Sequence, residues 1–209
     1  MSLTIWLVIL VPLAIFAWLV AQAMPSPRDR QLGRLRARAR TLDLQVSLRQ
    51  LKDPDPDPAS RVSGGGRVRD AKLDLAAYTA PLRLPAGVEK RHAPAWRVCR
   101  MRHHAQEQYD EGLPAGWRFD LAELPLREPV LAELAALLAR APEGTAALEA
   151  SAREVTLCWR ERGEADAVDE VAALLADVVA FQLARAAESA QRERAGAGAA
   201  AGEDLAGSD

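Results

Sequence analysis

Residues 154–178, EVTLCWRERGEADAVDEVAALLADV, contain the two patterns that decide the fold. In the first six residues, apolar side chains alternate with polar or small ones, which predicts a strand with one apolar face. After Gly163, apolar residues recur at spacings of three and four, which predicts an amphipathic helix. A strand followed directly by a helix, each with one apolar side, predicts a sheet packed against helices.

The same two patterns recur upstream of this stretch. Residues 130–138 have helical spacing, start after Pro129 and end before Pro142. Strand patterns occupy 44–51, 72–84 and 96–102, and residues 117–121 are a candidate for a short strand within a long loop. The predicted fold class is therefore α+β: an N-terminal transmembrane helix, then a small, mostly antiparallel sheet of about four strands packed by two or three helices.

Composition suggests where the parts of the chain begin and end. The proline- and glycine-rich residues 52–71 have few apolar side chains, and residues 195–209 are rich in Gly, Ala and acids, so we expect a disordered linker and a disordered tail. The expected parts are a transmembrane anchor (1–24), a basic juxtamembrane amphipathic helix (25–43), a first strand of the cytoplasmic domain (44–51), the linker (52–71), the cytoplasmic α+β domain (72–194) and the tail (195–209).

Residues 3–23 form an apolar run without an ionisable side chain. As a helix the run would be about 31 Å long, which is enough to cross a bilayer core. Arginines follow the run instead of preceding it, which predicts a retained single-pass anchor in the bacterial inner membrane, with the N-terminus outside and the C-terminal domain cytoplasmic. Trp6 and Trp18 lie toward its ends and are expected to contact the membrane interface.

The apolar run is followed by a basic segment. Its arginines are Arg28, Arg30, Arg34, Arg36, Arg38 and Arg40. Such residues are attracted to anionic headgroups by about 1 kcal/mol each near a membrane surface. The formal net charge of the whole chain is −2, so the rest of the chain is acidic and nucleic acid is not an expected partner. The expected partners are the lipid bilayer with its anionic headgroups and an unidentified protein.

Cys99, His103 and His104 are the best candidates for a metal site, with Cys158 as a further thiol. If residues 96–103 are one strand, however, Cys99 and His103 share a face and His104 points away. His103 and His104 with Glu107 also suggest an acid–base pair, but no nucleophile motif accompanies them. Because cysteines without such a motif are usually small buried residues, we expect no metal, no cofactor and no catalytic residue.

Two further patterns have a structural interpretation. The run of glycines at 64–66 lacks the lysine and the serine or threonine of a phosphate-binding loop. Trp96, Trp117 and Trp159 lie in apolar surroundings, which is more typical of a core than of a ligand pocket.

Two families share short features with this chain. Residues 25–36, PSPRDRQLGRLR, directly after the apolar run, and residues 159–163, WRERG, resemble a group of uncharacterised single-pass membrane proteins of gammaproteobacteria. That resemblance implies no activity. A looser likeness is to the YajC family of translocase accessory subunits, which have an N-out span and a basic segment near a proline. The glycine-containing β domain of that family has no match here.

The favoured function is a membrane-tethered cytoplasmic module that binds a protein or organises a membrane complex, without catalysis. A translocase-accessory subunit is the more specific variant of this hypothesis. The rival hypothesis is a membrane-tethered enzyme or ligand sensor, which predicts that Cys99, His103, His104 and Trp117 converge in a concave site.

Overall fold

The computed structural model describes residues 6–7, 10–16, 18, 26–56, 71–101, 110–123 and 127–206, with side chains up to residue 196. The chain divides into two compact units, Met1–Arg34 and Leu35–Asp209.

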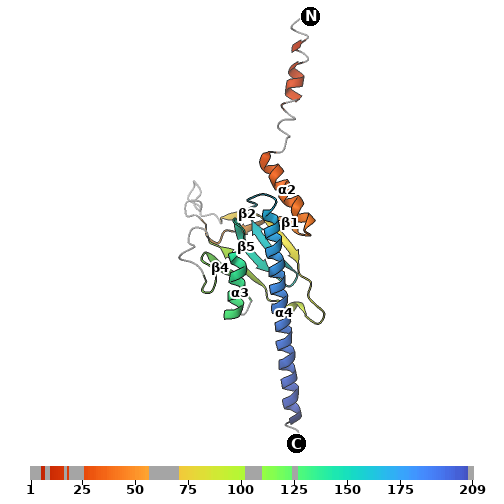
Figure 1. The fold of residues 1–209 in the computed structure, drawn as a ribbon, viewed down its shortest axis with the longest axis vertical. Helices are drawn as coiled ribbons and strands as arrows, with labels where there is room; N and C mark the ends of the chain where they lie inside the picture. Colours follow the sequence, from red (N-terminus) through yellow and green to blue (C-terminus); the bar gives the residue numbers. More distant parts are fainter. Residues whose placement is uncertain are drawn as a thin grey trace. The chain divides into compact units, whose positions relative to one another are not determined.

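The second unit is built on one antiparallel sheet of six strands in the order β1-β2-β6-β5-β3-β4 (Figure 1). The strands are β1 Gln45–Lys52, β2 Lys72–Pro81, β3 Trp96–Arg100, β4 Trp117–Ala122, β5 Thr145–Ala150 and β6 Glu154–Trp159. The two edge strands are therefore β1 and β4. They differ in regularity: β1 pairs with β2 in an unbroken register, whereas the pairing of β4 with β3 shifts between Arg97 and Val98.

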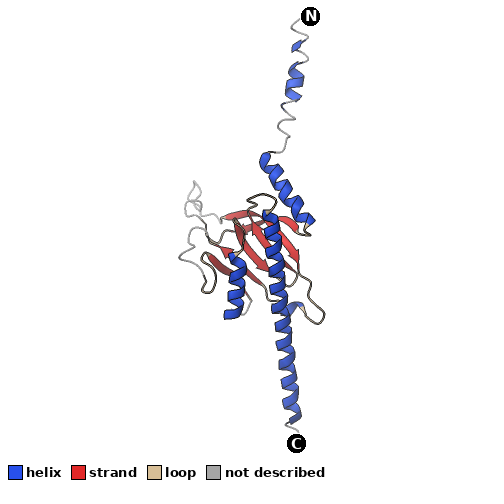
Figure 2. Cartoon of the chain, in the orientation of Figure 1, coloured by secondary structure: helices blue, strands red, loops and turns tan. Residues whose placement is uncertain are grey.

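Helices α3 (Glu128–Ala139) and α4 (Ala167–Ala206) cover one face of the sheet (Figure 2). The core lies between the sheet and these helices and contains the large fully buried side chains, among them Tyr78, Trp96 and Trp159. Tyr78 and Trp159 meet edge to face with ring centroids 5.6 Å apart. Aromatic side chains remove the most apolar area from water, so this layer supplies most of the stabilisation.

Part of helix α2 and a short 3₁₀ turn also belong to the second unit. Helix α2 runs from Pro27 to Thr41, and its residues from Leu35 onward belong to this unit, where Leu35 and Ala39 are fully buried. A 3₁₀ turn, η2 (Lys90–His92), precedes β3 and contacts α4. The hydrophobic side of α2 therefore packs into the domain at its C-terminal half.

The predicted sheet of about four strands is wrong, because the sheet has six. The strand that no sequence pattern predicts is β5, Thr-Ala-Ala-Leu-Glu-Ala. Alanine has low strand propensity, and the pattern of β5 does not alternate cleanly. This segment becomes a strand because β3 and β6 pair with it on both sides, which is a tertiary effect.

The predicted transmembrane helix over residues 3–23 is also wrong. Within the ranges that the structure describes, no helix is both long enough and apolar enough to cross a membrane. The longest helical stretch described in this region, 10–16, would be about 10 Å long, a third of a bilayer core. An apolar run alone does not specify one continuous helix, and Pro12 removes a backbone donor inside it. The single-pass inner-membrane location that rested on this helix is withdrawn with it.

Two other expectations concern the linker and the tail. Most of the expected linker, residues 57–70, lies outside the described residues, as do residues 1–5, 8–9, 17 and 19–25 of the N-terminal run. The last helix is longer than expected, since α4 continues to Ala206, through most of the expected tail.

Candidate functional site

The face of the sheet that α3 and α4 do not cover, here called the second face, has smaller side chains than the helix-covered face. Its centre is a cluster of strand residues, Leu75, Ala77, Cys99, Ala147 and Cys158, all at most 7% exposed. They share this face because they occupy directly paired or alternate positions: Cys99 pairs with Ala147, and Ala147 pairs with Cys158. Four of the five are Ala or Cys on adjacent strands, so the middle of this face carries only short side chains.

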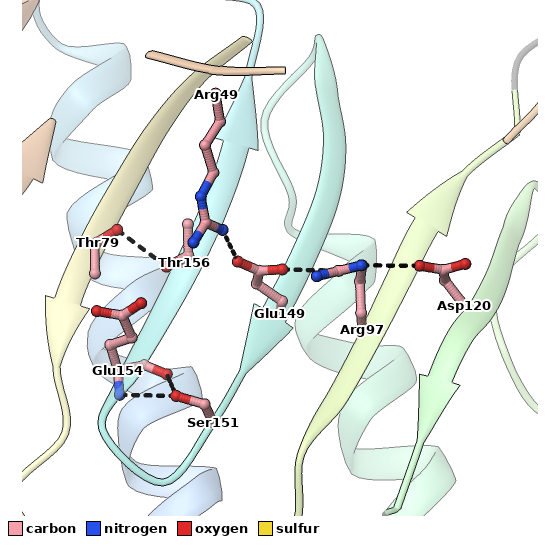
Figure 3. Close-up of polar contacts among 8 residues, drawn as sticks. All are labelled: Arg49, Thr79, Arg97, Asp120, Glu149, Ser151, Glu154 and Thr156. Carbon is pink, nitrogen blue, oxygen red and sulfur yellow. Dashed lines mark hydrogen bonds and ion pairs between the residues drawn. The ribbon is translucent and has the colours of Figure 1, made fainter. Parts of the chain in front are cut away.

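Charged side chains form a line across the centre of the second face. We call this line the charge chain, and its members are Arg49, Glu149, Arg97 and Asp120 (Figure 3). Arg49 extends from β1 across β2 and β6 to the carboxylate of Glu149 on β5. The other oxygen of Glu149 accepts a hydrogen bond from Arg97 Nε at 2.7 Å. Arg97 Nη1 then donates to Asp120 Oδ2 on β4 at 3.0 Å. The charge chain thus links both edge strands, β1 and β4, to the centre of the sheet.

Arg97 is the central cation of the charge chain. Burial acts to lower the pKa of Arg97, but its hydrogen bonds to Glu149 and Asp120 outweigh that effect and raise the pKa. Arg97 and Asp120 remain 35% and 54% exposed, so solvent screens their interaction. The charge chain therefore contributes more to fixing side-chain positions than to the free energy of folding.

A groove of about 550 Å³ lies beside the charge chain. Its apolar lining is Leu51, Leu73, Cys99, Met101, Phe119 and Ala147, and its charged lining includes Lys52, Arg97, Arg118 and Asp120. Strands β1, β2, β3, β4 and β5 all contribute, although β1 and β4 are opposite edges of the sheet. Arg118 is exposed and makes no ion pair with any side chain that the structure describes.

Cys99 lines this groove, but its chemistry is that of a buried thiol. Burial raises the pKa of Cys99 to about 12 and that of Cys158 to about 11. Both thiols are therefore protonated near neutral pH, and the thiolate is the form that acts as nucleophile or metal ligand. The two cysteines flank Ala147 across two strand spacings, about 10 Å, which is too far for a disulfide.

The structure describes only part of the expected metal or acid–base site around Cys99. His103, His104 and Glu107 lie outside the described residues. Trp117 is buried under the guanidinium of Arg100, at 5.8 Å from the ring centroid, and does not line the groove. In the parts of the chain that are described, no three His, Cys, Asp or Glu side chains are grouped so as to hold a metal ion.

The residues expected at a membrane surface divide between the two units. Arg28, Arg30 and Arg34 belong to the first unit, where Trp6 and Trp18 are exposed. Arg40 is exposed in the second unit. Their expected contact with lipid stays a prediction.

Arg36 and Arg38 bind acidic side chains of the domain, which the sequence analysis did not foresee. Arg36 donates to both carboxylate oxygens of Glu161, at 2.9 and 2.6 Å, and Arg38 donates to Asp169 at 2.7 Å. The hydroxyl of Tyr78 also donates to Glu161, at 3.0 Å. The hydrogen bonds that Arg36 donates to Glu161 raise the pKa of Arg36, and burial is the main cause that raises the pKa of Tyr78.

The sequence held one usable signal for the groove. Arg97 and Cys99 are two residues apart on a predicted strand, so they had to share a face. Glu149 lies on a strand that the sequence pattern does not predict, and Arg118 lies in the predicted short strand at 117–121, where no pattern marks it as part of a groove. Comparison with models of protein families, with curated proteins and with solved structures gives no match.

Proposed function

We propose that the second unit is a protein-binding module that takes an extended segment of a partner protein in the groove of the second face. The observation that carries the proposal is the combination of an apolar lining with the exposed Arg118 on the same groove. Protein-binding surfaces typically combine an apolar centre with a polar rim. The apolar lining favours an aliphatic or aromatic side chain of the partner, and Arg118 favours an acidic one.

The size of the groove supports a peptide segment as the ligand. A volume of about 550 Å³ accommodates a few side chains and falls in the usual range of binding pockets, about 300–1,000 Å³. The charge chain holds Arg97 and Asp120 in place before a partner arrives, so less side-chain entropy is lost on binding. An enzymatic role has less support, because the groove thiol of Cys99 has a raised pKa.

Crosslinking from inside the groove tests this proposal. A photo-crosslinking amino acid would replace Leu73 in the groove or, as a control, the exposed Ala139 on α3. We expect a discrete crosslinked partner from position 73 and none from position 139. Arg118→Glu should reduce that product about tenfold, because an ion pair becomes a repulsion. Arg153→Glu, an exposed charge reversal in the turn between β5 and β6, should leave it unchanged.

The results that contradict the proposal are equally specific. Equal crosslinking from positions 73 and 139, or equal loss with Arg118→Glu and Arg153→Glu, would mean that the groove does not select the partner.

A second candidate function, sensing of a small ligand, uses the same groove. It is favoured by the position of Cys99 inside a cavity large enough for a drug-sized molecule. Native mass spectrometry of the purified full chain separates the two functions. A co-purifying small molecule that Leu73→Trp displaces would support the sensor, and its absence together with a position-73 crosslink would support the protein-binding module.

A further inference from the structure

Edge strand β1 is unusually open to pairing with another strand. It is eight residues long, contains no proline and pairs with β2 without a bulge from Gln45 to Lys52. Six of its eight residues are exposed. Natural sheets usually protect their edges with short strands, prolines, bulges or inward-pointing charges, and the opposite edge, β4, does carry a register shift. The backbone on the outer side of β1 is a template for a further strand.

Leu48, at the middle of β1, is 74% exposed, the most exposed large apolar side chain in the described part of the chain. It lies on the helix-side face of the strand, with Val46 and Gln50. An exposed leucine in the centre of this edge strand combines apolar area with a row of backbone donors and acceptors that no strand described by the structure pairs on the outer side.

The sequence of β1 is compatible with antiparallel pairing to itself. If a twofold axis passes through Leu48, the strands pair over residues 45–51, with Leu48 opposite Leu48, Val46 opposite Gln50, and Ser47 opposite Arg49. No two like charges are then directly opposed. An axis through Arg49 would oppose two arginines, which is destabilising. An axis through Ser47 would shorten the pairing to residues 45–49.

The charge chain reduces the charge repulsion that Arg49 would otherwise cause between two paired β1 strands. Arg49 is the only charged residue between positions 45 and 51, and its guanidinium is held by Glu149 on β5, away from the edge. We propose that two copies of this chain pair antiparallel through β1, with Leu48 on the twofold axis, to form one continuous sheet across both copies. The interface is isologous, as is usual for homodimers.

Cysteine crosslinking of the full chain tests the register. In the proposed dimer, Leu48→Cys places two sulfur-bearing residues directly opposite each other, with Cα atoms about 4.5–5.5 Å apart, within disulfide range. Gln50→Cys is the matched control on the same strand and face. Its two copies would lie four residues apart along the strands, about 13 Å, and cannot bridge. The native Cys99 and Cys158 are buried and give the background of the assay.

We expect mild oxidation to convert most of Leu48→Cys, and little of Gln50→Cys or the wild type, into a covalent dimer on a non-reducing gel. Equal crosslinking of both variants, or none with Leu48→Cys, overturns the proposal.

Sedimentation equilibrium of charge variants tests the interface independently of oxidation. Leu48→Lys opposes two lysines on the axis and should weaken dimerisation at least about tenfold, whereas Gln50→Lys faces Val46 and should change it little. Circular dichroism confirms that both variants fold. Because the first unit also exposes apolar side chains, an oligomer that Leu48→Lys leaves intact contradicts the proposal. The proposal is also contradicted if the wild type is a monomer and the Leu48→Cys variant forms a disulfide only with a different protein. Arg118→Glu should leave the dimer intact, so this test is separate from that of the groove.

Discussion

The two faces of the sheet differ in the size and charge of their side chains. The helix-covered face presents Tyr78, Trp96 and Trp159, whereas the second face presents Ala, Cys and Thr at its centre and a line of charges across it. Trp159 and Cys158 are neighbours on β6, and because strand side chains alternate, Trp159 lies on the helix-covered face and Cys158 on the second face. Stability is therefore concentrated on one face, which leaves the other able to carry charges and a groove.

The largest expected effect comes from removing an aromatic side chain of the helix-covered face. Trp159→Ala deletes the contact with Tyr78 and the hydrogen bond from Trp159 Nε1 to the carbonyl of Glu143 at 2.7 Å. We expect a loss of about 3–5 kcal/mol in the free energy of unfolding, measured with urea. Thr156→Ala, on the second face of the same strand, loses only a hydrogen bond to Thr79 and should cost about 1 kcal/mol. Equal costs would remove the distinction between the faces.

The second effect is a dependence of stability on alkaline pH that arises from the second face. The pKa values of Cys99 and Cys158 are raised in the folded protein, to about 12 and about 11. Above about pH 9 the unfolded thiols ionise while the folded ones stay protonated, so the unfolded state binds fewer protons and stability falls as pH rises toward the folded pKa values. Between pH 8.5 and 10 the loss should be roughly 2–3 kcal/mol for both thiols together.

Urea titrations at several pH values measure this slope. The double variant Cys99→Ala, Cys158→Ala is less stable at pH 7, but its stability should depend less on pH above 9. A slope identical to that of the wild type would show that other groups cause the loss.

An intermediate effect is expected in the charge chain. Glu149→Gln keeps the shape of the side chain but leaves Arg49 and Arg97 without their shared anion, so it should cost about 1–2 kcal/mol. Asp120→Asn removes the exposed end of the chain and should cost less than about 0.5 kcal/mol. Thermal unfolding at low and high salt compares the two variants. If Asp120→Asn were the more costly, the centre of the second face would not be organised by Glu149.

The smallest effect on stability is expected at the rim of the groove. Arg118 is exposed, so Arg118→Glu should change the free energy of unfolding by less than about 0.5 kcal/mol while it reduces partner crosslinking. Urea unfolding of the same preparation used for crosslinking measures both properties. A large loss of stability would mean that Arg118 supports the fold, and the loss of binding would then carry no information about the groove.

Local sequence patterns predict the elements that have strong periodicity. The alternation in Glu154–Trp159 and the helical spacing of 130–138 correspond to β6 and α3, and Trp96 and Trp159 are buried as predicted. Strand β5 was missed because its alanines signal no strand until two neighbours pair with them. The apolar run at 3–23 is the opposite case: its hydrophobicity predicts one long helix, but no helix that the structure describes there is long enough and apolar enough to cross a membrane.

The groove could not be predicted from the sequence, for a different reason. It depends on strand order: Leu51 and Phe119 line one cavity although they lie on strands at opposite edges of the sheet. Likewise, Arg49 and Glu149 are 100 residues apart, and nothing local marks them as partners. Alternation assigns a residue to a face, but only the order and register of all six strands show which residues of that face lie together.

The ion pairs that Arg36 and Arg38 of α2 form with Glu161 and Asp169 affect the order in which the chain folds. Arg36 and Glu161 are 125 residues apart, and Arg38 and Asp169 are 131 apart. Contacts between such distant residues form late, because closing a long loop must precede them. During synthesis, the C-terminal half of α2 cannot complete these ion pairs until residues 161 and 169 have left the ribosome. The ion pairs that hold α2 to the domain are thus among the last contacts that the growing chain can form.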